Sequence, residues 1–234
     1  MVIRAVTVDA HGVLLLPDPV AIRTVLREFD CQPDDATCWE AHYRMVRLLD
    51  DTHDPDWPTM NRSFAEALGV APLYQEHSGA MLARQVYLGT AWVPVPEASA
   101  ALNRLVSGGY GVAVVTNTLH GEMAELLVRT KMCAVGGDFA PVAAVIDSQV
   151  IGVEKPDPRP FELALAALNA TASECVHVGD SWHSDVVGAR SVGMDAIHVD
   201  PLELCHESDH GHVSSFAAFV NELLGQNEIP IFSQ

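Results

Sequence analysis

Short runs of apolar, β-branched residues lie at the start of the chain and through its second half. Such runs, bounded by glycine or polar residues, predict buried strands over Val2–Val8, Tyr110–Thr118, Val142–Ile146, Cys175–Val178 and Ala196–Val199. Between them, apolar residues at helical spacing predict helices over Glu97–Val106, Glu122–Arg129, Phe161–Leu168 and Val186–Val192. Strands that alternate with helices at this spacing indicate an α/β fold with a parallel sheet and right-handed crossovers.

Residues 17–91 follow a different pattern, because helical spacing dominates and no clear strand is present. A turn signal at Leu15–Pro19 precedes this segment, and the proline-rich linker Trp92–Pro96 follows it. The acidic stretch Asp50–Pro58 lies inside it and is expected to be a solvated loop between helices. The pattern therefore predicts two domains: an α/β core formed by residues 1–16 and 92–234, and a smaller all-helical domain over residues 17–91.

The chain beyond the fifth predicted strand is polar and rich in histidine. Residues 201–212 combine one cysteine with several histidines and acids, namely Cys205, His206, Asp209, His210 and His212. This composition allows adventitious binding of a soft metal, but we expect a mobile polar loop. Ser214 is predicted to cap a last helix that runs to Leu224, and residues 226–234 are expected to form a loose tail.

The charge of the chain limits its partners. Lysine and arginine number 13 against 31 aspartate and glutamate, which gives a net charge of −18. Such a field repels phosphate backbones and anionic lipids, so we expect neither nucleic acid nor a membrane surface as a partner. The five cysteines form no C-x-x-C pair, and no apolar stretch approaches the length of a membrane span. We therefore expect a cytoplasmic protein without a secretory leader.

The ends of three predicted strands carry the candidate chemistry. Asp9 and Asp180 follow the first and fourth strands, and together they suit a hard, oxygen-seeking cation such as Mg²⁺. Thr116 and Asn117 end the second strand, and Lys155 lies in a proline-bearing loop before a helix. We predict that these last three residues bind an anion close to the metal.

These residues resemble the motifs of the haloacid dehalogenase superfamily of aspartyl-nucleophile hydrolases. The matching segments are Asp9-Ala-His11-Gly12-Val13-Leu14, Val114-Val-Thr116-Asn117, Gly152-Val-Glu-Lys155-Pro-Asp-Pro, and Gly179-Asp180 through Asp185. The resemblance implies a Rossmann-like core with a helical cap inserted after the first motif. It also implies that Asp9 is the nucleophile, that Thr116 and Lys155 hold the transferring group, and that Asp9, Asp180 and Asp185 bind Mg²⁺.

One position departs from the family pattern. Phosphatases of the family have a second aspartate where this chain has His11; that aspartate protonates the leaving group and then activates water. A histidine can donate and accept a proton near neutrality. The resemblance also implies that the main-chain carbonyl of His11 is a metal ligand, whatever the side chain. The resemblance thus implies a Mg²⁺-dependent phosphatase of a small phosphorylated metabolite, with an aspartyl-phosphate intermediate. Two alternatives stay open: another aspartyl-nucleophile hydrolysis, of a phosphonate or haloacid, and a catalytically silent binding protein.

Overall fold

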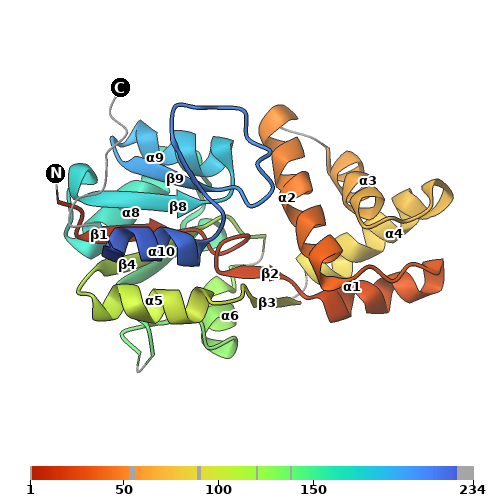
Figure 1. Cartoon of the computed structure of the whole chain (residues 1–234), viewed down its shortest axis with the longest axis horizontal. Coiled ribbons are helices and arrows are strands. Elements are labelled where there is room, and N and C mark those ends of the chain that lie inside the picture. Colours follow the sequence, from red (N-terminus) through yellow and green to blue (C-terminus); the bar gives the residue numbers. More distant parts are fainter. Residues whose placement is uncertain (1, 53–55, 89–90, 120, 138, 226–234) are drawn as a thin grey trace. The chain divides into compact units, whose positions relative to one another are not determined.

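The computed structural model describes residues 2–52, 56–88, 91–119, 121–137 and 139–225. The chain divides into two compact units (Figure 1). Unit 1 comprises Met1–Leu14 and Pro94–Gln234, and unit 2 comprises Leu15–Val93. The expected tail at 226–234 lies outside the described residues. Within the described ranges, no helix combines the length and the apolar character that crossing a membrane requires.

A six-stranded parallel sheet forms the centre of unit 1. Its strands are β1 (Ala5–Val8), β4 (Gly111–Thr116), β7 (Ala144–Asp147), β8 (Cys175–Gly179), β9 (Asp195–Val199) and β10 (Gly211–Val213). Their order across the sheet is β10-β9-β8-β1-β4-β7, and neighbouring strands pair in parallel. The predicted α/β class with a parallel sheet is confirmed. Because the strand order reverses beside β1, the carboxyl end of β1 is the place where a doubly wound sheet opens a crevice for ligands.

Helices cover the sheet of unit 1. They are α5 (Ala98–Ser107), α6 (Met123–Arg129), α7 (Ser148–Ile151), α8 (Pro158–Leu168), α9 (Gly188–Ser191) and α10 (Phe216–Gly225). Helix α8 packs on β4 and β7, whereas α10 packs against α5 (Figure 1). Phe161 on α8 is fully buried against Ala113 and Val115 of β4. Unit 1 also contains short helical turns and a two-stranded pair: η4 (Ala172–Glu174), η5 (Trp182–Val187), β5 (Ala134–Val135) and β6 (Pro141–Val142).

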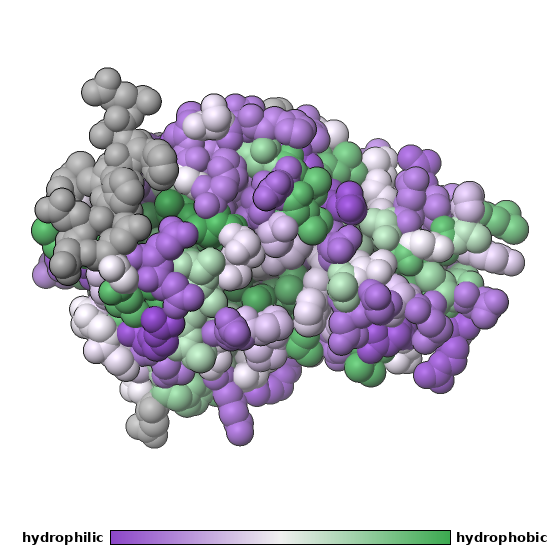
Figure 2. All heavy atoms as spheres, viewed as in Figure 1, coloured by the Kyte–Doolittle hydropathy of each residue, from purple (hydrophilic) through white to green (hydrophobic). Residues whose placement is uncertain are grey.

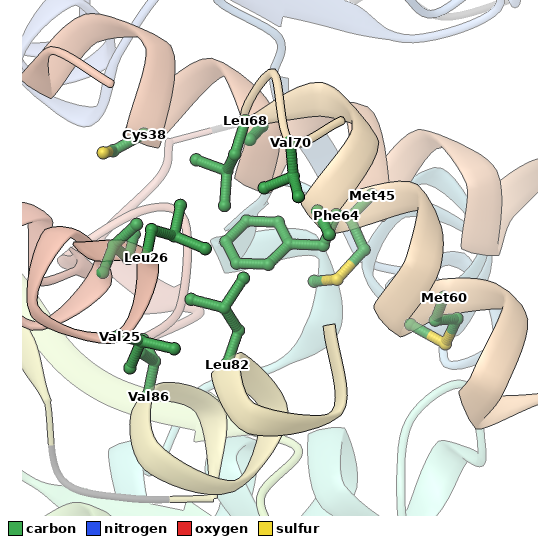
Figure 3. Close-up of a cluster of buried hydrophobic side chains, with 13 residues drawn as sticks. Val25, Leu26, Cys38, Met45, Met60, Phe64, Leu68, Val70, Leu82 and Val86 are labelled. Carbon is green, nitrogen blue, oxygen red and sulfur yellow. The ribbon is translucent and has the colours of Figure 1, made fainter. Parts of the chain in front are cut away.

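Unit 2 is mainly helical, as its pattern predicts. Its helices are α1 (Pro19–Leu26), η1 (Arg27–Phe29), α2 (Asp35–Thr52), α3 (Trp57–Ala67), η2 (Pro72–Tyr74), α4 (Gln75–Leu82) and η3 (Ala83–Tyr87). Figure 3 shows the apolar core of this unit, in which the ring of Phe64 lies among Leu26, Met45, Val70 and Leu82. Burial of these side chains supplies the main driving force for folding the unit. That this unit acts as a cap domain stays a prediction.

Unit 2 also contains a pair of strands that the sequence analysis takes for a turn and a linker. β2 (Leu15–Pro17) pairs with β3 (Trp92–Pro94), and the main-chain nitrogen of Asp18 donates to the Ala91 carbonyl at 2.9 Å. Next to this pair, within unit 1, the nitrogen of Val95 donates to the Leu14 carbonyl at 2.9 Å. Each strand ends in proline, which lacks a donor and is tolerated only at strand ends and edges. The chain therefore leaves and re-enters unit 1 at adjacent positions.

Three local predictions need correction. The mobile loop expected over 201–212 is wrong at its end, since Gly211–Val213 form β10 and His210 is buried. The loop expected over Asp50–Pro58 begins later, because α2 continues to Thr52; its residues 53–55 lie outside the described ranges. The last helix is capped by Ser215, not by Ser214: the Ser215 hydroxyl accepts from the nitrogen of Ala218 at 3.1 Å.

Polar residues are spread over the whole face drawn in Figure 2, with apolar residues in smaller groups between them.

All five cysteines are thiols, and three of them, Cys38, Cys133 and Cys175, are buried. Burial raises the pKa of Cys133 to about 12, so this thiol stays protonated.

Candidate active site

Asp9 lies directly after β1, at the reversal of strand order. Its main-chain nitrogen donates to the Val178 carbonyl of β8 at 2.8 Å, which continues the sheet pairing past the end of the strand. One carboxylate oxygen accepts a hydrogen bond from the nitrogen of Ala10 at 2.6 Å. Gly12 follows with a φ of 70°, which a residue without a Cβ adopts readily, so the chain turns away from the sheet there. Asp9 is thereby fixed in a buried position.

Lys155 joins two buried carboxylates. Its ammonium lies 3.1 Å from Oδ2 of Asp9 and 2.6 Å from Oδ1 of Asp185, and it donates to the Val115 carbonyl at 3.0 Å. The side chain is buried, which lowers the pKa of Lys155, but the charges of Asp185 and Asp9 outweigh burial and raise it above its usual value. An ammonium has three donors, so these contacts use its full hydrogen-bonding capacity.

Asn117 positions Lys155 through the main chain. Its side-chain nitrogen donates to the Lys155 carbonyl at 2.9 Å, and its side-chain oxygen accepts from the Lys155 nitrogen at 2.8 Å. The two bonds connect the end of β4 to the loop that carries the lysine. Direct contact of Asn117 with a substrate stays a prediction, and the geometry gives this amide a positioning role that the sequence did not reveal.

Asp185 is held from several sides. Besides Lys155, Nε2 of His177 lies 2.9 Å from its Oδ1, and the nitrogen of Ser181 donates to its Oδ2 at 3.0 Å. A Cβ at Gly179 would lie 2.1 Å from Cγ of Asp185, so only glycine leaves room for this carboxylate. Burial raises the pKa of Asp185, but the charge of Lys155 and the bond from His177 outweigh burial and hold it well below its usual range.

His177, which lies on β8, orients Asp185 through a hydrogen bond. Because a carboxylate only accepts, Nε2 of His177 carries the proton, and Nδ1 then accepts from the hydroxyl of Thr7, 2.9 Å away. The sequence predicts that His177 is a packed strand residue and not a catalytic one, and it does not reveal the contact with Asp185. His177 lies on β8 two residues before Gly179, and this closeness to the Gly179-Asp180 motif is the signal in the sequence that connects it with the site.

Three carboxylates gather at this edge of the sheet. Oxygens of Asp9, Asp180 and Asp185 all lie within 4.8 Å of one another, and all three residues are buried. Burial raises the pKa of Asp9 to about 7, the charges of Asp185 and Asp180 add to the rise, and Lys155 opposes it. One ammonium cannot neutralise three carboxylates, and oxygen ligands at this spacing suit Mg²⁺. Both oxygens of Asp185 already accept hydrogen bonds, and so do both oxygens of Asp9, so ligation of a metal by any of the three carboxylates stays a prediction.

Thr116 ends β4, the strand next to β1. The residue is 1% exposed, and within the described part of the chain its hydroxyl has no hydrogen-bond partner. A buried hydroxyl without a partner costs free energy, which a ligand at the site would recover. His11 lies two residues after Asp9 and is partly exposed; its place in the chemistry stays a prediction.

Comparisons with known proteins agree on the class of this site. The family model described as haloacid dehalogenase-like hydrolase matches residues 3–193. A ribulose-1,5-bisphosphate 5-phosphatase from Halopiger xanaduensis is 36% identical over 115 residues, which cover 49% of this chain and 44% of the relative. A glyceraldehyde 3-phosphate phosphatase from Pyrococcus abyssi is 37% identical over 103 residues, which cover 44% and 41%.

The matches to these curated relatives span less than half of their length. The fold extends further: the structure of a dehalogenase with an intermediate complex aligns with a TM-score of 0.61 at 21% identity, covering 96% of this chain and 98% of that one. At such identity the likeness concerns the fold alone, and it does not separate phosphatases from dehalogenases.

Proposed function

Because this chain belongs to the haloacid dehalogenase-like hydrolase family, we propose that it hydrolyses the phosphoric monoester of a small metabolite in the cytoplasm, with Mg²⁺. The observation that carries the proposal is the cluster of Asp9, Asp180 and Asp185 around a single lysine. This excess of buried carboxylate favours a divalent cation, which a phosphatase of the family uses and the dehalogenase branch does not need. The two phosphatase relatives support the same choice.

In this mechanism a carboxylate oxygen of Asp9 attacks phosphorus, and the bond from phosphorus to the ester oxygen breaks. His11 gives its proton to the departing alcohol; it then takes a proton from the water that attacks phosphorus of the aspartyl phosphate. Breakage of the new bond releases inorganic phosphate and restores Asp9. Thr116 donates its hydroxyl to a phosphoryl oxygen, and this contact satisfies a buried group that otherwise has no partner.

Lys155 acts mainly through its charge. All three of its donors are engaged, so it meets a phosphoryl oxygen only when its 3.1 Å contact with Asp9 is exchanged. Before that exchange, the ammonium offsets the negative charge of Asp9 and lowers the repulsion of the incoming phosphate. When bound, Mg²⁺ supplies further positive charge beside the transferring group; Asp9 and Asp180 would hold it.

The test is a panel of phosphomonoesters, phosphonates and haloacids, assayed with Mg²⁺ and after its removal by a chelator. We expect turnover of phosphomonoesters only with Mg²⁺, and its loss in Asp9→Asn and Asp180→Asn. Asp195→Asn is the matched control, because Asp195 is exposed on β9 in the same unit and takes no part in the site. Turnover of haloacids without metal would replace this proposal with dehalogenation.

His11 decides between an enzyme and a silent scaffold. If His11 is the acid and base, His11→Ala loses roughly 10²–10⁴-fold in rate on a substrate with a poor leaving group. A substrate with a good leaving group loses less, because its alcohol needs no proton. An inactive wild type that gains phosphatase activity in His11→Asp would establish the binding-protein alternative instead.

A further inference from the structure

A second cluster of metal-ligating side chains lies on β9, on the edge strand β10 and on the segment between them. One ligand atom from each of His198, Cys205, His210 and His212 lies within 4.8 Å of the others. His198 and His212 are register partners in the parallel pair β9–β10, so their side chains leave the sheet on the same face. The rings of His210 and His212 have centroids 4.3 Å apart.

Hydrogen bonds fix which ring nitrogens carry protons. Nε2 of His198 lies 3.0 Å from the main-chain oxygen of Asp180, and Nδ1 of His210 lies 2.8 Å from Oδ1 of Asp209. Both oxygens can only accept, so both of these nitrogens are donors. In the neutral rings, Nδ1 of His198 and Nε2 of His210 are therefore both lone-pair acceptors.

These two acceptor nitrogens face one another at 3.2 Å. Two lone pairs at this distance repel unless a positive charge lies between them, and a metal ion is the charge that two imidazoles and a thiol bind together.

The distances fit a tetrahedral ion. Metal–nitrogen bonds of about 2.0–2.1 Å place two ligating nitrogens about 3.3 Å apart, and a Zn–S bond of about 2.3 Å places sulfur slightly farther from them. The observed separations are 3.2 Å between the facing nitrogens of His198 and His210, and 3.8 Å between Sγ of Cys205 and Nε2 of His210. Only small movements are needed to close the set around one ion.

Outer contacts hold the ligands in place. Asp209, which orients His210, is itself bonded to Arg190 at 2.6 Å. The carboxylate of Asp200 accepts from the nitrogens of Leu204 and Cys205 at 2.9 and 2.8 Å, and so fixes the main chain that carries the thiol. A carboxylate behind a ligating histidine is the usual support of protein zinc sites.

We propose that His198, Cys205, His210 and His212 bind one Zn²⁺-type ion, in a site separate from the carboxylate cluster and independent of the proposed hydrolysis. Three imidazoles and one thiolate are a ligand set for zinc, whereas Mg²⁺ prefers oxygen. The ion joins residues 205–212 to the sheet, and through His198 it also steadies the main-chain oxygen of Asp180. His212 is exposed, which leaves a path for the ion to enter.

The test uses the full chain, stripped of metal by a chelator and titrated with Co²⁺ in excess Mg²⁺, which occupies the carboxylate cluster. We expect one equivalent of Co²⁺ with the intense visible bands of a tetrahedral ion, a near-ultraviolet thiolate charge-transfer band, and loss of both on addition of Zn²⁺. Cys205→Ser loses the charge-transfer band. Asp209→Asn, which removes only an outer contact, lowers the affinity about 10–100-fold.

His206→Ala is the matched control, since His206 lies exposed in the same segment and outside the cluster; it should bind like wild type. Zn²⁺ should raise the melting temperature of the stripped wild type and not that of Cys205→Ser, a readout that remains if a histidine variant fails to fold. Weak octahedral bands without charge transfer, or equal affinity in Cys205→Ser and His206→Ala, would overturn the proposal.

Discussion

Lys155→Met is expected to destabilise unit 1 strongly. The methionine keeps the length of the side chain but removes the ammonium that lies 2.6 Å from Asp185 and 3.1 Å from Asp9. Asp185 is fully buried, and among the described residues it then keeps His177 and the Ser181 nitrogen as partners for its charge. Removing one partner of a buried ion pair costs about 3–5 kcal/mol, because a charge stays buried without compensation.

The loss of stability in Lys155→Met depends on pH, because it arises from the charge of a carboxylate. In the wild type the pKa of Asp185 is lowered, so this group contributes stability above its unfolded pKa and loses it as the pH falls. The variant lacks most of that contribution. The difference between wild type and variant is therefore largest near pH 7 and shrinks below about pH 4, the unfolded value for aspartate.

Scanning calorimetry on the full chain, repeated over a range of pH, measures both effects as shifts of the melting temperature. In a unit of this size, about 3–5 kcal/mol corresponds to a fall of roughly 6–20 °C in the melting temperature. Lys131→Met is the matched control, since Lys131 is the other lysine of the chain and is exposed. An equal fall in both variants, or a difference that does not change with pH, would refute the reasoning.

Three further predictions concern other parts of the structure. Gly179→Ala should displace Asp185 and destabilise unit 1 by about 3–5 kcal/mol in denaturant titrations, whereas Gly111→Ala, whose Cβ would have the flexible end of Leu168 as its nearest neighbour at 3.1 Å, should cost far less; similar losses would contradict the clash. Calorimetric Mg²⁺ affinity should fall as the pH drops through about 7, because a proton competes for Asp9; equal affinity at pH 8 and pH 6 would count against it. Phe64→Ala should lower the stability of unit 2 by about 3–5 kcal/mol, and an unshifted calorimetric transition would contradict a central place of this ring in the core of unit 2 (Figure 3).

The site residues that directly follow strands with long apolar runs could be predicted from the sequence. Asp9 and Asp180 follow long apolar runs, and parallel strands bring their carboxyl ends to one edge of a sheet. β10 escaped prediction because it has three residues, one of them an exposed histidine, and therefore no apolar pattern. The double contact of Asn117 with Lys155 escaped it as well, since 38 residues separate the partners and nothing local marks the pairing. The place of His198 in the second cluster could not be predicted either, because the residue has the pattern of an ordinary strand position and only the pairing of β9 with β10 brings His212 beside it.

The adjacent exit and entry of the chain at unit 1 have a consequence for the order of folding. β1 and β4 are neighbours in the sheet although about 100 residues separate them, and most of that separation is unit 2. Once unit 2 has folded, the β2–β3 pair holds its two ends together, and the loop to be closed between β1 and β4 shortens about fourfold. Each halving of a flexible loop saves about 0.6 kcal/mol of closure entropy, so the folded insert lowers the entropic cost of pairing β1 with β4 by roughly 1.2 kcal/mol. The folded helical insert thus favours the pairing of β1 with β4 by holding the two ends of the intervening chain together.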